Sequence, residues 1–238
     1  MVFTCAVFME LVSGAYSVDI LQPNKRRIKN VDDMNFIPLK NRFLEGMQKL
    51  LVVDNFDSFT YNLIHLVEMI GVDFEVRRNS NLGQLDLDLF SHLIIGPGPG
   101  LPSESGDLMK LLDSWPISKP ILGVCLGMQA MLQREGGELQ NLSPVFHGAQ
   151  SDVFQRKIGV GIFKELPQSF KVGRYHSWGF SAKAVPNSYQ TIVTDAEDLV
   201  MAVKHTGLDW YGVQFHPESI MTEHGLKLLT AFVQTKSQ

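Results

Sequence analysis

An apolar run over residues 120–124 ends at Cys125, with one glycine two positions before the cysteine and another two positions after it. A helical pattern follows over 126–134 and stops at a pair of glycines. This order is typical of a buried strand that turns sharply into a helix, because residues without a Cβ let the two elements pack closely. The free N–H groups and the positive dipole end of the helix favour a thiolate at the turn. A buried structural cysteine is the alternative, since free cysteine often acts as a small apolar side chain.

Length and charge indicate a globular chain without disulfides. The chain has 238 residues, is 45% hydrophobic and has a formal net charge of −4. This length is enough for one α/β domain, and the mild acidity argues against a nucleic-acid surface. Two cysteines, Cys5 and Cys125, give no disulfide framework and suit a reducing compartment. No apolar run reaches membrane-spanning length, so we expect a cytoplasmic protein that binds neither nucleic acid nor a membrane.

The first 46 residues differ in pattern from the rest. Residues 1–12 are apolar without a basic leader, and residues 25–29 are mostly basic, with no clear periodicity. We interpret 1–46 as an N-terminal extension that is disordered or weakly packed, and 47–238 as a single domain. A targeting or partner-docking arm is the alternative for the extension, and its role stays open.

Strand and helix patterns alternate from residue 47 onward. Strands are predicted over 48–54, 74–76, 92–95 and 121–124, and helices over 59–70, 108–112 and 126–134. Asp57 or Ser58 is predicted to cap the first helix, and Gly71 to end it. The alternation predicts an α/β fold with a mostly parallel central sheet flanked by helices, and with Cys125 at a strand–helix elbow.

Beyond residue 140 the pattern changes to short apolar runs separated by turn signals. These runs lie at 152–154, 159–163, 171–175, 191–194, 200–203 and 211–215, and a last helix is predicted over 225–233. We expect the short runs to form a smaller antiparallel addition to the central sheet.

A loop rich in glycine and proline, residues 96–100, follows the third predicted strand. Ligands bind beyond the carboxyl ends of parallel strands, so this loop and Cys125 are expected at the same edge of the sheet. The loop lacks the lysine and hydroxyl residue of a P-loop. The backbone N–H groups of Gly98 and Leu126 can bracket an oxyanion there. An ordinary tight turn is the alternative.

A histidine and an acid follow the last predicted strand. His216 and Glu218 are two positions apart, so in extended backbone their side chains project to one side. A carboxylate beside an imidazole fixes its tautomer and leaves the other nitrogen to serve as a base for a thiol. A surface histidine with a neighbouring acid is the alternative, because the chain has seven histidines.

Two further features fit a substrate site. Gln129 lies one helical turn beyond Cys125, on the same helix face, where it can hold a polar group or simply face solvent. Residues 174–178 form a polar-aromatic cluster, which indicates either a substrate-binding edge or a turn with a buried Trp178.

Taken together, these segments resemble the class I glutamine amidotransferases. The pattern Gly123-x-Cys125-x-Gly127-x-Gln129 and the later His216-Pro217-Glu218 occur in the order of that family. Residues 54–63, 97–100, 174–177 and 212–219 resemble the branch that serves anthranilate synthase and aminodeoxychorismate synthase. The resemblance covers about residues 47 to 238. Met128 and Trp178 depart from the histidine and leucine that are usual in this branch.

The resemblance implies that Cys125 attacks the side-chain amide of L-glutamine, while His216, oriented by Glu218, transfers the proton. It implies that ammonia passes to a separate chorismate-binding synthase subunit. It implies contacts with glutamine or the oxyanion at Gly98, Pro99, Gly100, Leu126, Gln129, Ser177 and Trp178. No metal or cofactor is implied in this chain, and Mg²⁺ is expected in the partner subunit.

Some questions stay open at the level of the sequence. The product, anthranilate or aminodeoxychorismate or both, is not fixed, nor are the identity and stoichiometry of the partner. A stand-alone γ-glutamyl thiol hydrolase can use the same triad. A non-catalytic regulatory subunit of the same fold is a third reading, against which the joint presence of Cys125, His216 and Glu218 argues.

Overall fold

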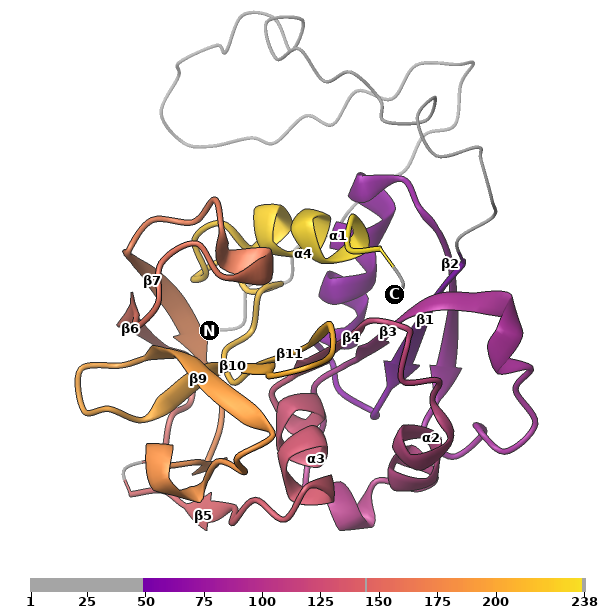
Figure 1. Cartoon of the computed structure of the whole chain (residues 1–238), viewed down its shortest axis with the longest axis horizontal. Coiled ribbons are helices and arrows are strands. Elements are labelled where there is room, and N and C mark those ends of the chain that lie inside the picture. Colours follow the sequence, from indigo (N-terminus) through magenta and orange to yellow (C-terminus); the bar gives the residue numbers. More distant parts are fainter. Residues whose placement is uncertain (1–48, 144, 237–238) are drawn as a thin grey trace, which may run out of the picture. The chain divides into compact units, whose positions relative to one another are not determined.

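The structure is a computed structural model that describes residues 49–143 and 145–236. It confirms the α/β fold with a parallel core. The described residues form a nine-stranded sheet in the order β2-β1-β3-β4-β11-β10-β9-β6-β7 (Figure 1). The predicted extension over 1–46 and the start of the domain at residue 47 lie outside the described residues.

Five neighbouring strands of this sheet are parallel. They are β2 (Asp73–Arg78), β1 (Lys49–Asp54), β3 (Phe90–Ile95), β4 (Ile121–Val124) and β11 (Trp210–Val213). The antiparallel addition consists of β10 (Val200–His205), β9 (Tyr189–Thr194), β6 (Ala149–Gln155) and β7 (Ser169–Arg174). A separate antiparallel pair joins β5 (Gln140–Asn141) to β8 (Trp178–Gly179).

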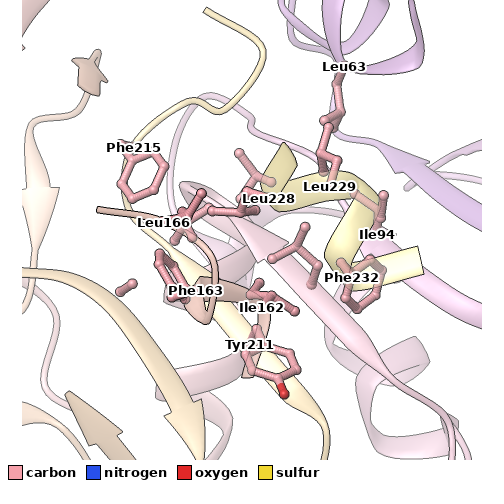
Figure 2. Packing of buried hydrophobic residues seen from close by; sticks show 14 of the residues in the cluster. Leu63, Ile94, Ile162, Phe163, Leu166, Tyr211, Phe215, Leu228, Leu229 and Phe232 are labelled. Carbon is pink, nitrogen blue, oxygen red and sulfur yellow. The ribbon is translucent and has the colours of Figure 1, made fainter. Parts of the chain in front are cut away.

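Helices cover both faces of the parallel strands. Side chains of α1 (Thr60–Ile70) and α4 (Gly225–Val233) belong to one apolar core, and those of α2 (Leu108–Ser114) and α3 (Leu126–Arg134) to the other. Strand β1 serves both cores, because Leu50 and Val52 face the first and Leu51 and Val53 the second. Figure 2 shows the first core, where Leu63, Leu228, Leu229 and Phe232 pack near Ile94. Among the described residues, none of the helices is long and apolar enough to cross a bilayer.

Two predictions about the late strands were wrong. The run at 159–163 is not a strand but contains a short 3₁₀ helix, η5 (Gly161–Phe163), because Gly159 and Gly161 have positive φ angles of 78° and 52°. Strand β11 pairs antiparallel with β10, as expected, but it also pairs in parallel with β4 and so belongs to the parallel core. All four of its residues are buried, as is typical of a central parallel strand, and so short an apolar run does not reveal its direction.

The first helix ends as predicted but begins differently. Gly71 ends it in the left-handed region with φ 79° and donates its N–H to the carbonyls of Val67 and Glu68. The helix begins at Thr60, with Phe59 in the capping position and no side-chain cap. Asp57 instead accepts the N–H of Phe59 at 2.7 Å, so it stabilises the turn before the helix.

Candidate active site

Cys125 lies on the turn between β4 and α3. Its backbone angles, φ 51° and ψ −103°, lie in a region that residues with a side chain seldom adopt. Its N–H donates to the Val213 carbonyl at 2.7 Å, and its carbonyl accepts the Gln129 N–H at 3.1 Å. A Cβ on Gly123 would lie 2.5 Å from the backbone of Gly127, so these glycines allow the strand and the helix to meet closely. The turn holds the sulfur at the start of a helix, where a thiolate is favoured.

His216 and Glu218 meet in a buried pair. Nδ1 of His216 lies 2.7 Å from Oε1 of Glu218, and the two side chains are 3% and 0% exposed. The expected extended backbone was wrong here, because the N–H of Ser219 donates to the His216 carbonyl at 3.2 Å and closes a turn. The N–H of His216 donates to Gly173 of β7 at 3.1 Å, which fixes the histidine to the antiparallel addition.

The charge state of His216 follows from its neighbours. Burial lowers its pKa, but hydrogen bonding and negative charge from Cys125 and Glu218 more than offset this and raise the pKa to about 10. Nε2 of His216 and Oε2 of Glu218 are enclosed without an aligned hydrogen-bond partner among the described residues. Nε2 is therefore the nitrogen left for Cys125, and such contacts are often poorly aligned before substrate binds. The arrangement favours a thiolate–imidazolium pair.

Two aromatic rings hold the imidazole in place. Phe59 and Tyr175 stand edge-on to His216, with ring centroids 5.4 Å and 5.0 Å away, and pack on each other at 4.7 Å. The hydroxyl of Tyr175 shares a hydrogen bond of 3.1 Å with Ser219. Sequence reasoning assigned Phe59 to a helix face and Tyr175 to a substrate edge, and a contact between segments so far apart leaves no local pattern.

A cluster of amides lies beside the cysteine. Gln129 is buried rather than on the surface, and its Nε2 donates to the Trp178 carbonyl at 3.1 Å and to Oε1 of Gln214 at 3.2 Å. Gln214 is fully buried, and its Nε2 lies 3.5 Å from Sγ of Cys125. Sequence reasoning gave Gln214 no role. The available signal was a polar residue inside the apolar run over 212–215.

The loop after β3 lies against the start of α3. A Cβ on Gly98 would come within 2.6 Å of the Leu126 side chain and 2.5 Å of Asn55. Asn55 holds this loop by donating to the Gly96 carbonyl at 2.8 Å. Leu126 is the first residue of its helix, so its N–H has no acceptor within the helix. The two predicted oxyanion residues, Gly98 and Leu126, are thus neighbours.

The remaining predicted contact residues are at least partly exposed. Pro99 and Gly100 are exposed on the loop, and Gly100 has a positive φ of 74°. Ser177 and Trp178 are half-buried, so the alternative of a turn with a buried Trp178 was wrong. Within the described part of the chain, no group of three or more histidine, cysteine or acidic residues could hold a metal ion.

Known proteins resemble this chain over most of its length. The sequence profile of the family described as glutamine amidotransferase class-I matches residues 51–235. Aminodeoxychorismate synthase component 2 of Serratia marcescens is 38% identical over 190 residues, which cover 77% of this chain and 98% of the relative. Anthranilate synthase component 2 of Azospirillum brasilense is 38% identical over 189 residues, covering 78% and 95%. The solved structure of a glutamine amidotransferase from Thermotoga maritima matches with a TM-score of 0.62 at 15% identity, covering 79% and 97%, and shares the fold.

Proposed function

Since the chain belongs to the class I glutamine amidotransferase family, we propose that Cys125, His216 and Glu218 release ammonia from L-glutamine. The chain is the glutamine amidotransferase component of an anthranilate or aminodeoxychorismate synthase. The assignment of these residues depends mainly on the buried pair of His216 and Glu218. Nε2 of His216 is enclosed and is left to contact Cys125, which lies on a strained turn.

The geometry supports a thioester mechanism. The Cys125 thiolate attacks the side-chain amide carbon of glutamine, and the N–H groups of Gly98 and Leu126 stabilise the oxyanion that forms. Each such donor contributes about 3 kcal/mol to the transition state. The His216 imidazolium gives its proton to the departing nitrogen, and ammonia leaves. Water, deprotonated by His216, then hydrolyses the γ-glutamyl thioester and releases glutamate.

Glutamine is held by the residues around this centre. Gln129 uses Nε2 for the Trp178 carbonyl and for Gln214, which leaves its Oε1 to accept an N–H of the substrate. Ser177 and Trp178 offer backbone groups on the side of Gln129. Pro99 and Gly100 extend the wall that begins at the oxyanion residues.

The ammonia passes to a second subunit. Both relatives above are component 2 of a synthase, which indicates that this chain works with a component 1. We place the chorismate site and Mg²⁺ in that partner, and the complex in the cytoplasm.

Cys125→Ser tests the assignment. In the complex, this variant should lose glutamine-dependent product formation and keep product formation from added ammonium chloride. Normal glutamine hydrolysis by Cys125→Ser would contradict the proposal. Assays of wild-type chain with and without the partner separate a synthase component, which the partner stimulates, from a stand-alone γ-glutamyl hydrolase, which has full activity alone.

A further inference from the structure

Gln214 is the buried amide that contacts the nucleophile. It follows β11, whose last residue Val213 pairs with Val124 of β4, so Gln214 and Cys125 leave two adjacent parallel strands together. Its Nε2 lies 3.5 Å from Sγ of Cys125. An N–H aimed at sulfur stabilises a thiolate more than a thiol, because hydrogen bonds to charged acceptors are the stronger ones. An amide oxygen in that place would repel the thiolate, so the orientation of this amide decides its effect.

Gln129 sets the orientation of Gln214. The Trp178 carbonyl can only accept a hydrogen bond, so the Gln129 atom 3.1 Å from it is the amide nitrogen. The same nitrogen lies 3.2 Å from the Gln214 side chain, and its second N–H needs an acceptor there. Gln214 therefore presents its oxygen to Gln129 and its nitrogen to Cys125.

His176 holds the Trp178 carbonyl from the other side. The guanidinium of Arg174 can only donate, so its Nε, 3.2 Å from Nε2 of His176, makes that ring nitrogen the acceptor. The ring proton then sits on Nδ1, which donates to the Trp178 carbonyl at 2.9 Å. Burial and the positive charge of Arg174 lower the pKa of His176 to about 3, so the ring stays neutral.

A buried ion pair anchors the far end of these contacts. Nη1 of Arg174 lies 2.8 Å from Oδ2 of Asp195, and the two side chains are 2% and 4% exposed. The hydrogen bonds thus run from Arg174 through His176, the Trp178 carbonyl and Gln129 to Gln214. At no step can donor and acceptor be exchanged without placing two donors or two acceptors together.

We propose that Gln214 is a further catalytic residue, which donates a hydrogen bond to the Cys125 thiolate and is fixed in that orientation by the hydrogen bonds that begin at Arg174. The inference rests on the proposed function, in which Cys125 is the nucleophile. The other groups that act on the sulfur are His216, which Glu218 orients, and the start of α3, and replacing the Gln214 side chain removes none of them.

The pH dependence of Cys125 alkylation by iodoacetamide tests the inference, in a Cys5→Ser background that leaves one thiol. Gln214→Met keeps the length and removes the amide, so we expect the alkylation midpoint to rise by about one pH unit, with a fall in rate that approaches tenfold only at pH values below the wild-type midpoint. Gln214→Glu should shift the midpoint further, since its carboxylate still accepts from Gln129 but places negative charge near the sulfur. Gln214→Glu keeps the size of the side chain and its hydrogen bond with Gln129, so it tests the inference even if Gln214→Met does not fold.

Steady-state kinetics in the complex give a second readout. Gln214→Met should lower kcat for glutamine hydrolysis with a smaller change in KM, because the lost contact is to the nucleophile. Gln133→Met, a like change farther along α3, is the matched control and should leave both profiles unchanged. Wild-type alkylation midpoints in both Gln214 variants would overturn the inference and leave the proposed function standing. Glutaminase activity in Cys125→Ser would instead remove the proposed function.

Discussion

At the residue scale, Cys125 combines an unfavourable backbone conformation with a reactive side chain. Its positive φ is uncommon for a residue with a Cβ and costs on the order of 1–3 kcal/mol. The carbonyl of Val213 and the first turn of α3 hold it in this conformation. The fold therefore stabilises a strained residue at the one place where its sulfur meets His216.

Comparing two variants isolates this strain. Cys125→Gly and Cys125→Ala both remove the sulfur, but only glycine adopts this conformation freely. We expect the glycine variant to be the more stable by about 1 kcal/mol or more, to which the better helix-capping by glycine adds. Urea unfolding measures the difference. Ala231→Gly in α4 is the control and should lose about 1 kcal/mol of unfolding free energy. If Cys125→Gly were no more stable than Cys125→Ala, the strain at residue 125 would be contradicted.

Glu218 should set the alkaline limit of activity. The carboxylate helps to raise the pKa of His216 to about 10, and the imidazolium is the form that protonates the departing nitrogen of glutamine. Glu218→Gln removes the negative charge and lowers that pKa, so the high-pH limb of kcat/KM should move down by about one unit or more, with lower turnover. A pH–rate profile measures this. An unchanged profile would remove Glu218 from the catalytic residues.

At the element scale, the contact between β4, α3 and β3 depends on two glycines. A Cβ on Gly127 would lie 2.4 Å from the Ile95 carbonyl oxygen, just as one on Gly123 would clash with Gly127. Backbone atoms line both contacts, so neither can yield through side-chain rotation. The position of the sulfur relative to the loop after β3 follows from this close packing.

Gly127→Ala should therefore separate α3 from β3. We expect a loss of about 1–3 kcal/mol in the free energy of unfolding, with slower alkylation of Cys125 as the turn shifts. Gly83→Ala is the control, because a Cβ there meets nothing within 4 Å, and it should change stability by less than about 0.5 kcal/mol. Equal stabilities of the two variants would show that the helix adjusts without cost.

Local sequence patterns predicted those elements whose conformation depends on nearby residues. The glycine-flanked elbow and the parallel core follow from spacing and hydropathy. His216 and Glu218 meet as predicted, but through a turn instead of the extended backbone on which that prediction relied. The direction of β11 and the helical turn at Gly161–Phe163 did not follow from these patterns, since short apolar runs look alike in either case. The role of Gln214 was not predictable, because contacts across 85 and 89 positions of the sequence leave no period to read.

At the scale of the whole molecule, buried histidines make the free energy of unfolding depend on pH in two opposite directions. Burial lowers the pKa of His92 and of His176 below the value near 6.5 expected in the unfolded chain. The contribution of these lowered pKa values to the free energy of unfolding is fully present above about pH 6.5 and is lost as the pH falls below that value. His216 acts in the opposite sense, because its raised pKa gives stability that is lost as the pH rises toward about 10.

His92→Gln tests the acid limit away from the active site. Nε2 of His92 lies 2.7 Å from the Thr235 carbonyl, and a glutamine amide can replace this donor without titrating. Between pH 7 and 5 the variant should lose less unfolding free energy than wild type, by at most about 1.4 kcal/mol per pH unit, the value for one proton. Urea unfolding at both pH values measures this, and the exposed His65→Gln controls for loss of a histidine. Identical losses in wild type and His92→Gln would contradict the assignment.

The parallel pairing of β4 with β11 has a consequence for protein synthesis. Strand β11 follows every other described strand in sequence, yet it lies next to the strand that ends at the cysteine. On the ribosome, the thiol emerges well before the imidazole that activates it, since chains grow from the N-terminus. A nascent chain that stops before His216 thus carries the thiol without its base. Glutamine hydrolysis therefore cannot begin until translation has passed Glu218.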